Sequence, residues 1–159
     1  MKAEFINPFL VSTKNVLETM CQTKVTANSP LLKEGNCSYG EITGLIGMAS
    51  KTIQGCMILS FSKSCILQIV ANMLFEEPQT TINDDIVDAV GELTNMICGG
   101  AKATLSKLNH KFDLATPTMV VGKGIEISYY TDFPTIVIPF STEHGDFVIE
   151  ANLGYKKEE

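Results

Sequence analysis

The segment 83–108 constrains the fold more than any other part of the chain, because its apolar residues recur every three or four positions. An α-helix has about 3.6 residues per turn, so this spacing places the apolar side chains on one face. They are Ile86, Val90, Leu93, Ile97, Ala101, Leu105 and Leu108. The pattern predicts a long amphipathic helix that buries this face in the core.

The two ends of this segment carry residues typical of helix boundaries. At the start, Asn83, Asp84 and Asp85 offer side-chain oxygens to free backbone N–H groups and suit the positive end of the helix dipole. At the other end, the cationic Lys107 and Lys111 suit the negative end of the dipole. We therefore expect one continuous helix between Asn83 and about Leu108.

A second set of residues in the segment has the same spacing but lies about half a turn from the apolar face. We expect this set, which comprises Asp88, Glu92, Asn95, Gly99 and Lys102, to face solvent. The segment also contains Gly91, Gly99 and Gly100, although a glycine inside a helix costs roughly 1 kcal/mol relative to alanine. Two explanations stay open: close packing against a neighbouring helix, or the approach of a partner's backbone to the exposed face.

The remaining sequence predicts two further helices and a series of strands. One helix should have Asn7 as its N-cap and Pro8 as its first residue and reach about Thr23, and another should start at Ser62. Apolar alternation and turn residues predict strands at 25–29, 39–48, 52–61, 117–121, 125–130, 135–140 and 147–153. We expect the second and third strands to form a hairpin and the last four to form a meander.

The order of these elements decides the fold class. Helices and strands do not alternate regularly, which favours an α+β fold of two layers over a doubly wound parallel sheet. Each half of the chain begins with a helix and continues into strands, so a weak internal pseudo-repeat is also expected. The length of 159 residues fits a single domain, residues 1–159.

Composition excludes several classes of function. The chain has a net charge of −6 and contains no arginine, which argues against nucleic acid as a partner. No apolar run reaches the roughly 18 residues of a membrane span, and the N-terminus has no apolar run of signal-peptide length. The five cysteines are widely spaced and form no CxxC pair, so buried free thiols are expected. We therefore expect a cytoplasmic protein with no membrane contact.

The chemistry of the exposed face centres on Glu92 and Asn95, which emerge from the same side of a helix because they are three residues apart. A carboxylate can bind a lysine of another protein, and a carboxamide can hold and orient a water molecule. These groups suit the hydrolysis of a phosphoryl group that a partner already carries and activates. The alternative is an ordinary solvated helix face. No cluster of residues with the spacing of metal ligands occurs, so no metal site is expected.

The stretch DAVGELTNMICGGAK, together with the downstream FDLATPTMVVGKG, resembles the signature of the CheC, CheX and FliY family of chemotaxis phosphatases. The family pattern is an Asp or Ser, three residues, a Glu, two residues and an Asn, which Asp88, Glu92 and Asn95 match. INPFLVSTKNVLETM, GEITGLIGM, GCMILSF and IVIPF are similar to the corresponding segments of CheX. CheC and FliY types carry two such motifs and this chain carries one, so CheX is the most similar type.

The resemblance implies a fold of long antiparallel helices on an antiparallel sheet. It implies hydrolysis of the phosphoaspartate of a CheY-type response regulator, with Glu92 bound to the regulator's lysine and Asn95 positioning the attacking water. The phosphatase would have no cofactor of its own, and Mg²⁺ would belong to the regulator. Asp88, Gly99 and Lys102 would have supporting or partner-binding roles, and CheX relatives imply a homodimer.

Two alternatives of the same fold remain. One is a module that binds a phosphorylated receiver domain without hydrolysing it. The other is a structural component of a motility complex, which would assemble stably with its partners and show no turnover.

Overall fold

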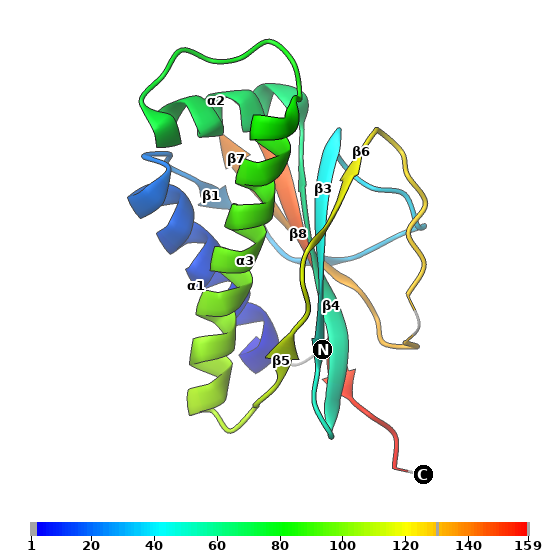
Figure 1. Ribbon diagram of the computed structural model, residues 1–159. Coiled ribbons are helices and arrows are strands. Elements are labelled where there is room, and N and C mark those ends of the chain that lie inside the picture. Colours follow the sequence, from blue (N-terminus) through cyan, green and yellow to red (C-terminus); the bar gives the residue numbers. More distant parts are fainter. Residues whose placement is uncertain (1–2, 130, 159) are drawn as a thin grey trace.

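The computed structural model describes residues 3–129 and 131–158 and has two layers (Figure 1). One layer consists of three helices: α1 (Ala3–Met20), α2 (Lys63–Leu74) and α3 (Asp84–Lys107). The other is an antiparallel sheet of β1 (Thr26–Ala27), β2 (Leu31–Leu32), β3 (Ile42–Ala49), β4 (Ile53–Phe61), β5 (Asp113–Leu114), β6 (Thr118–Val121), β7 (Ile136–Thr142) and β8 (Gly145–Tyr155). The expected α+β class with long antiparallel helices is confirmed.

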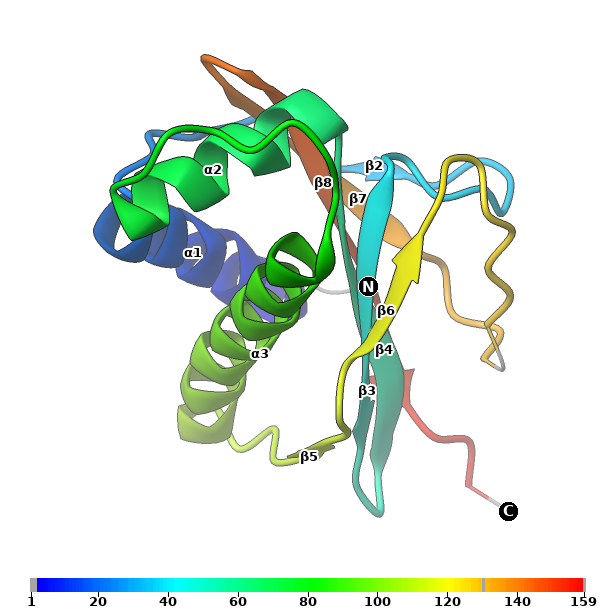
Figure 2. The ribbon, with the colours of Figure 1, turned by 45° about the horizontal axis from the view of Figure 1, so that its top comes forward.

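The helices cover one face of the sheet, while the segments that follow β2 and β6 run over the other face (Figure 2). The main core lies between helices and sheet. It includes Phe9 and Leu17 of α1, Ile66 and Ile69 of α2, and the apolar stripe of α3. Burial of this helical face agrees with the predicted periodicity from Ile86 to Leu105. The predicted burial of Leu108 is wrong, because α3 ends at Lys107 and the Leu108 side chain is 48% exposed.

The sheet has the order β1-β7-β8-β4-β3-β5, with β2 also paired to β7 and β6 also paired to β3. The predicted β3–β4 hairpin is confirmed, with Ile42 opposite Phe61. The predicted meander of the last strands is wrong, because β6 pairs with β3 whereas β7 pairs with β8, and β8 pairs with β4. The hairpin β3–β4 therefore sits in the middle of the sheet, and the C-terminal strands add to both of its sides.

The predicted strand 125–130 is also wrong for its described residues, and Tyr130 lies outside them. This segment makes one isolated bridge, between Glu126 and Cys37, instead of joining the sheet. Its apolar alternation has another cause, since Ile127 is buried while its neighbours Glu126 and Ser128 are exposed. Ile125 and Tyr129 are also partly buried, so the alternation reflects side-chain packing without strand pairing.

The start of α1 corrects the prediction for Asn7 and Pro8. The helix begins at Ala3, so Asn7 is not its N-cap and Pro8 lies inside it. A proline in the interior lacks an N–H for the helical hydrogen bond. The preceding turn is held by tertiary packing, because Phe5 is buried with its ring 4.7 Å from the His110 ring and 5.8 Å from the Tyr155 ring, centroid to centroid.

Local signals placed α2 and α3 correctly. Ser62 is the N-cap residue of α2, and the Asn83 side chain accepts a hydrogen bond of 3.2 Å from the Ile86 N–H at the start of α3. The contact of Phe5 with His110, which follows α3, shows that α1 and α3 run antiparallel. In Figure 1 α3 crosses α1, and both helices lie on the same side of the sheet.

All five cysteines are free thiols, but the expectation that they are buried holds for only three of them. Cys21, Cys65 and Cys98 are buried, Cys56 is half-buried and Cys37 is exposed. Burial raises the pKa of Cys98 to about 12 and that of Cys21 to about 11. These buried thiols therefore stay protonated near neutral pH.

The close approach of α3 to β3 predicts that a side chain at Gly44 lowers the free energy of unfolding. A Cβ on Gly44 of β3 would overlap the Thr94 hydroxyl of α3, which already donates a 2.7 Å hydrogen bond to the Val90 carbonyl. We expect Gly44→Ala to lower the free energy of unfolding by about 1–3 kcal/mol in urea titrations, as overpacking does. Gly47→Ala on the same strand is the control, because its Cβ would meet Ala115 at an ordinary 3.6 Å. An equal effect of both substitutions would contradict this account.

Candidate active site

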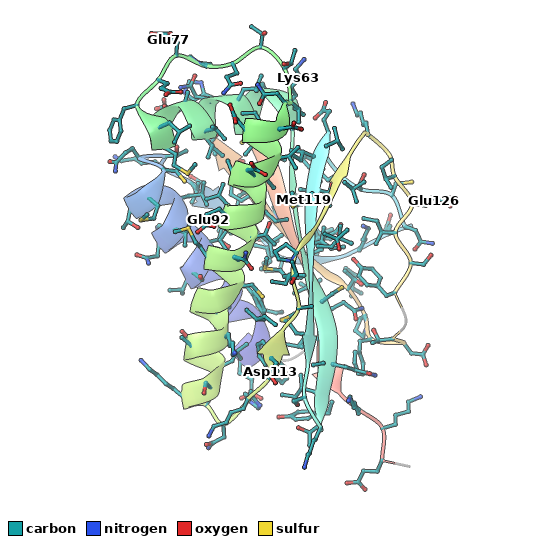
Figure 3. The ribbon with its side chains drawn as sticks, in the orientation of Figure 1. Lys63, Glu77, Glu92, Asp113, Met119 and Glu126 are labelled. Atoms are coloured by element: carbon teal, nitrogen blue, oxygen red, sulfur yellow. The ribbon has the colours of Figure 1, made fainter. Side chains whose placement is uncertain are left out.

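Three of the five residues predicted to face solvent are exposed on the outer side of α3, whereas Gly99 and Lys102 are half-buried. Asp88, Glu92 and Asn95 are exposed, while Leu93 and Thr94 between them are buried. Figure 3 shows Glu92 on α3, away from the sheet. Because the inner face of the same turns is buried in the core, the helix fixes the backbone positions of the two residues, while their side chains remain solvated. Their solvent exposure agrees with the sequence, and their chemical roles stay predictions.

Glu92 and Asn95 are free to bind a partner. Within residues 3–129 and 131–158, neither side chain has a hydrogen-bond or ion-pair partner. The sequence from Ser64 to Ala101 contains carboxylates but no lysine, arginine or histidine. The charged side chains of this segment are therefore all negative, and the segment does not itself attract a free phosphate ion. An anionic group could approach this segment only if the partner protein that carries it also neutralised its charge.

The three glycines of α3 have different surroundings. A Cβ on Gly100 would overlap the Ser12 hydroxyl and lie 3.2 Å from the Ser12 Cβ, so Gly100 allows α1 to pack closely. The Ser12 hydroxyl also donates a 2.7 Å hydrogen bond to the Ile97 carbonyl. A Cβ on Gly91 would meet the Met119 sulfur at an ordinary 3.7 Å, and a Cβ on Gly99 would meet no atom within 4 Å. Helix packing thus explains Gly100 and leaves Gly99 unexplained.

Lys102 is set apart from the other predicted residues. It lies two turns beyond Asn95, roughly 10 Å along the helix axis. Its side chain is 39% exposed, and its Nζ lies 3.9 Å from the Asp113 Oδ1. The structure therefore brings Asp88, Glu92, Asn95 and Gly99 together on neighbouring turns, with Lys102 at the edge of this face.

A cavity of about 500 Å³ lies elsewhere, among β3, β4 and residues 127–129 and 131. Its lining includes Leu45, Cys56 and Ile127 but none of the predicted site residues. Enclosed cavities are the usual location of small-molecule sites. The face of α3 is instead an open helix surface, which suits a protein as the binding partner.

Among the described residues, no group of three or more His, Cys, Asp or Glu side chains is arranged to hold a metal ion. No helix in the described part of the chain is long and apolar enough to span a membrane.

Sequence reasoning missed Phe75, which directly follows α2 and is 84% exposed. It stands between Leu74 and the acidic pair Glu76 and Glu77, and no pattern in the sequence predicts its exposure. An aromatic residue next to an acidic helix end was the one available signal.

Comparison with known proteins agrees with this geometry. A family model described as chemotaxis phosphatase CheX matches residues 42–141, which include α2, α3 and most of the sheet. The chain belongs to the CheX family. A curated member, the CheY-P phosphatase CheX of Thermotoga maritima, is 29% identical over 103 residues. That match covers 64% of this chain and 66% of the relative, slightly less than two thirds of its length.

Two solved structures share the CheX-type fold over almost the whole chain. A CheC-like superfamily protein from Shewanella sp. PV-4 is 41% identical with a TM-score of 0.90, covering 97% of this chain and 99% of the other. The CheX of a CheX-CheY-BeF3-Mg²⁺ complex from Borrelia burgdorferi is 24% identical with a TM-score of 0.78, covering 98% and 100%. The second similarity shows a common fold.

Proposed function

We propose that this protein hydrolyses the phosphoaspartate of a CheY-type response regulator on the outer face of α3. The observation that carries the proposal is the pair Glu92 and Asn95, exposed and without partners on a rigid helix of a CheX-family chain. The Thermotoga maritima relative is named a CheY-P phosphatase, and the Borrelia burgdorferi protein was solved in complex with CheY. Both names support a receiver domain as the partner.

The reaction needs few groups from this chain. Water attacks the phosphorus, the bond between phosphorus and the aspartate oxygen breaks, and inorganic phosphate leaves a free carboxylate on the regulator. Catalysis of such a transfer depends on positioning and on stabilising charge. Since the face of α3 is acidic and the described residues include no metal cluster, we place the Mg²⁺ that neutralises the phosphoryl group on the regulator.

Asn95 is proposed to position the water. Its carboxamide oxygen can accept a hydrogen bond from the water, which directs an oxygen lone pair at the phosphorus. Glu92 is proposed to bind the regulator's active-site lysine. This contact fixes the register of the two proteins, so that Asn95, one turn further along α3, meets the phosphoryl group.

Asp88 and Lys102 have lesser roles in this proposal. Asp88 lies one turn before Glu92 and extends the acidic surface that a lysine would approach. Lys102 lies near the other end of the face and is proposed as a contact to the partner, although its ion pair with Asp113 competes with that contact.

Alanine substitutions of Glu92 and Asn95 distinguish docking of the regulator from the hydrolysis step. We expect Asn95→Ala to lower kcat by roughly 100-fold with little change in KM, because an unpositioned water reacts slowly. We expect Glu92→Ala to raise KM and lower kcat together. The measurement is phosphate release from a CheY-type regulator charged with acetyl phosphate. The exposed residues Glu143 and Asn36 supply matched control variants, Glu143→Ala and Asn36→Ala, which should behave as wild type. Full activity of Asn95→Ala would contradict the proposed role.

Gly99 is proposed to leave space for the backbone of the docked receiver. Gly99→Ala should raise the free energy of unfolding by up to about 1 kcal/mol, because the added Cβ meets no atom and alanine favours the helix. Gly99→Leu should nevertheless weaken binding of a beryllofluoride-charged regulator, measured by fluorescence titration. The adjacent Gly100→Ala is the control for packing and should lower stability. Normal docking by a folded Gly99→Leu variant would refute the clearance role.

We also propose that the protein is a homodimer, as its resemblance to CheX implies. Size-exclusion chromatography with light scattering should give twice the mass of the 17.3 kDa chain. A monomeric mass across micromolar concentrations would contradict the proposal.

A further inference from the structure

Phe75 combines two unfavourable features at the C-terminal end of α2. Its side chain is 84% exposed, and its backbone is left-handed with φ 55°. Glycine is the usual residue at this helix-ending position, because other residues adopt positive φ less readily. The conformation is fixed, since the Phe75 and Glu76 N–H groups both donate to the Ala71 carbonyl. Packing within the chain therefore does not explain why an aromatic residue stands here.

Phe75 is part of an apolar patch formed by Met20, Leu74 and Phe75, which we call the α2-end patch. Met20 is 52% exposed and Leu74 is 47% exposed. The ends of α1 and α2 are joined by a 3.1 Å hydrogen bond from the Asn72 amide to the Thr23 hydroxyl. Figures 1 and 2 both show the C-terminal end of α2 lying over that of α1.

The α2-end patch lies beside the face that carries Glu92. Ser12 and Gly100 mark the contact between the antiparallel helices α1 and α3, and Met20 lies as many residues beyond Ser12 as Glu92 lies before Gly100. At about 1.5 Å per residue, both are roughly 12 Å from that contact in the same direction. Packed helix axes are about 8–10 Å apart at their contact. The two helices diverge from it toward α2 in Figure 1, so Met20 and Glu92 lie at the same end of the helix pair, one on each helix.

An interface with a docked receiver domain, centred on Glu92, would extend to the α2-end patch. A standard interface covers about 800 Å² on each partner, which corresponds to a radius of about 16 Å around Glu92. Interfaces are stabilised mainly by a few aromatic or other well-packed anchors, whereas exposed polar pairs contribute less. Glu92 and Asn95 are polar and solvated, so the anchor must come from residues around them.

We propose that Phe75 is an apolar anchor for the same receiver domain, inserted against an apolar side chain beside the regulator's phosphorylation site. This inference rests on the proposed function, and it names a specificity-determining residue outside the Glu92 and Asn95 motif. The regulator that this protein recognises should therefore present an apolar surface at that position as well as a lysine for Glu92.

The test is Phe75→Gly in the full-length protein, with a CheY-type regulator as the probe. We expect KM for phosphate release, and the Kd for the beryllofluoride-charged regulator, to rise about 10-fold or more. Saturated kcat should stay within twofold of wild type. The thermal midpoint should rise, because glycine relieves the left-handed conformation. Phe75→Tyr should retain wild-type KM, and Leu32→Ser, on the exposed strand β2 that pairs with β7, is the matched control.

The experiment distinguishes failure of the Phe75 anchor from failure of the proposed phosphatase function. If wild type binds the charged regulator and Phe75→Gly binds it equally well, the anchor is refuted while the phosphatase proposal stands. If Phe75→Gly leaves KM unchanged but alters the oligomeric mass, the patch contacts a second copy and the inference is also wrong. If wild type neither binds nor dephosphorylates the regulator, the proposed function itself fails.

Discussion

The close packing of α3 against its neighbours is the constraint on which the rest of the structure depends. It requires two positions without a side chain: Gly44 on β3 admits Thr94, and Gly100 on α3 admits Ser12 of α1. The Thr94 and Ser12 hydroxyls both bond to carbonyls of α3 itself, so neither remains unsatisfied in the core. The helix is thereby fixed against the sheet at the level of its exposed motif, through Thr94, and against α1 beyond the motif, through Gly100.

Because the inner side of α3 is anchored in the core, its outer side can present functional side chains to a partner protein without forming a pocket. Glu92 and Asn95 are held by a helix that cannot shift, whereas their side chains remain free and solvated. The substrate proposed here is a protein that brings its own phosphoryl group, lysine and metal ion. An open, acidic, rigid surface can complete such a site by adding a water-positioning amide, because the partner already supplies most of the charge stabilisation. The left-handed Phe75 extends this surface with an apolar contact.

Sequence reasoning succeeded where the determining interactions are local. The period of α3, its cap at Asn83 and the start of α2 at Ser62 depend on neighbours within one helical turn, and the spacing of Glu92 and Asn95 follows from the period. It failed where distant contacts decide. Pro8 lies inside α1 because Phe5 packs on His110 and Tyr155, and β6 joins β3 instead of β7.

Other features could not be read from the chain because they depend on side chains far apart in sequence. The buried ion pair between the Lys33 Nζ and the Glu150 Oε1, at 2.6 Å, joins a loop to β8 on the outer face of the sheet. The packing role of Gly100, which Gly99 lacks, can be recognised only when the position of α1 is known. The exposure of Phe75 can likewise be recognised only when the path of α2 is known. For the candidate site, the sequence therefore supplied the motif, and the structure supplied its surroundings.

The lifetime of the phosphoaspartate on a CheY-type regulator, measured with and without the wild-type protein, tests the central claim most directly. The account predicts that catalytic amounts of this protein shorten the lifetime and that the rate saturates as the regulator concentration rises. An unchanged lifetime at concentrations where the two proteins are shown to be bound would contradict it, and would leave the face of α3 as a binding surface without chemistry.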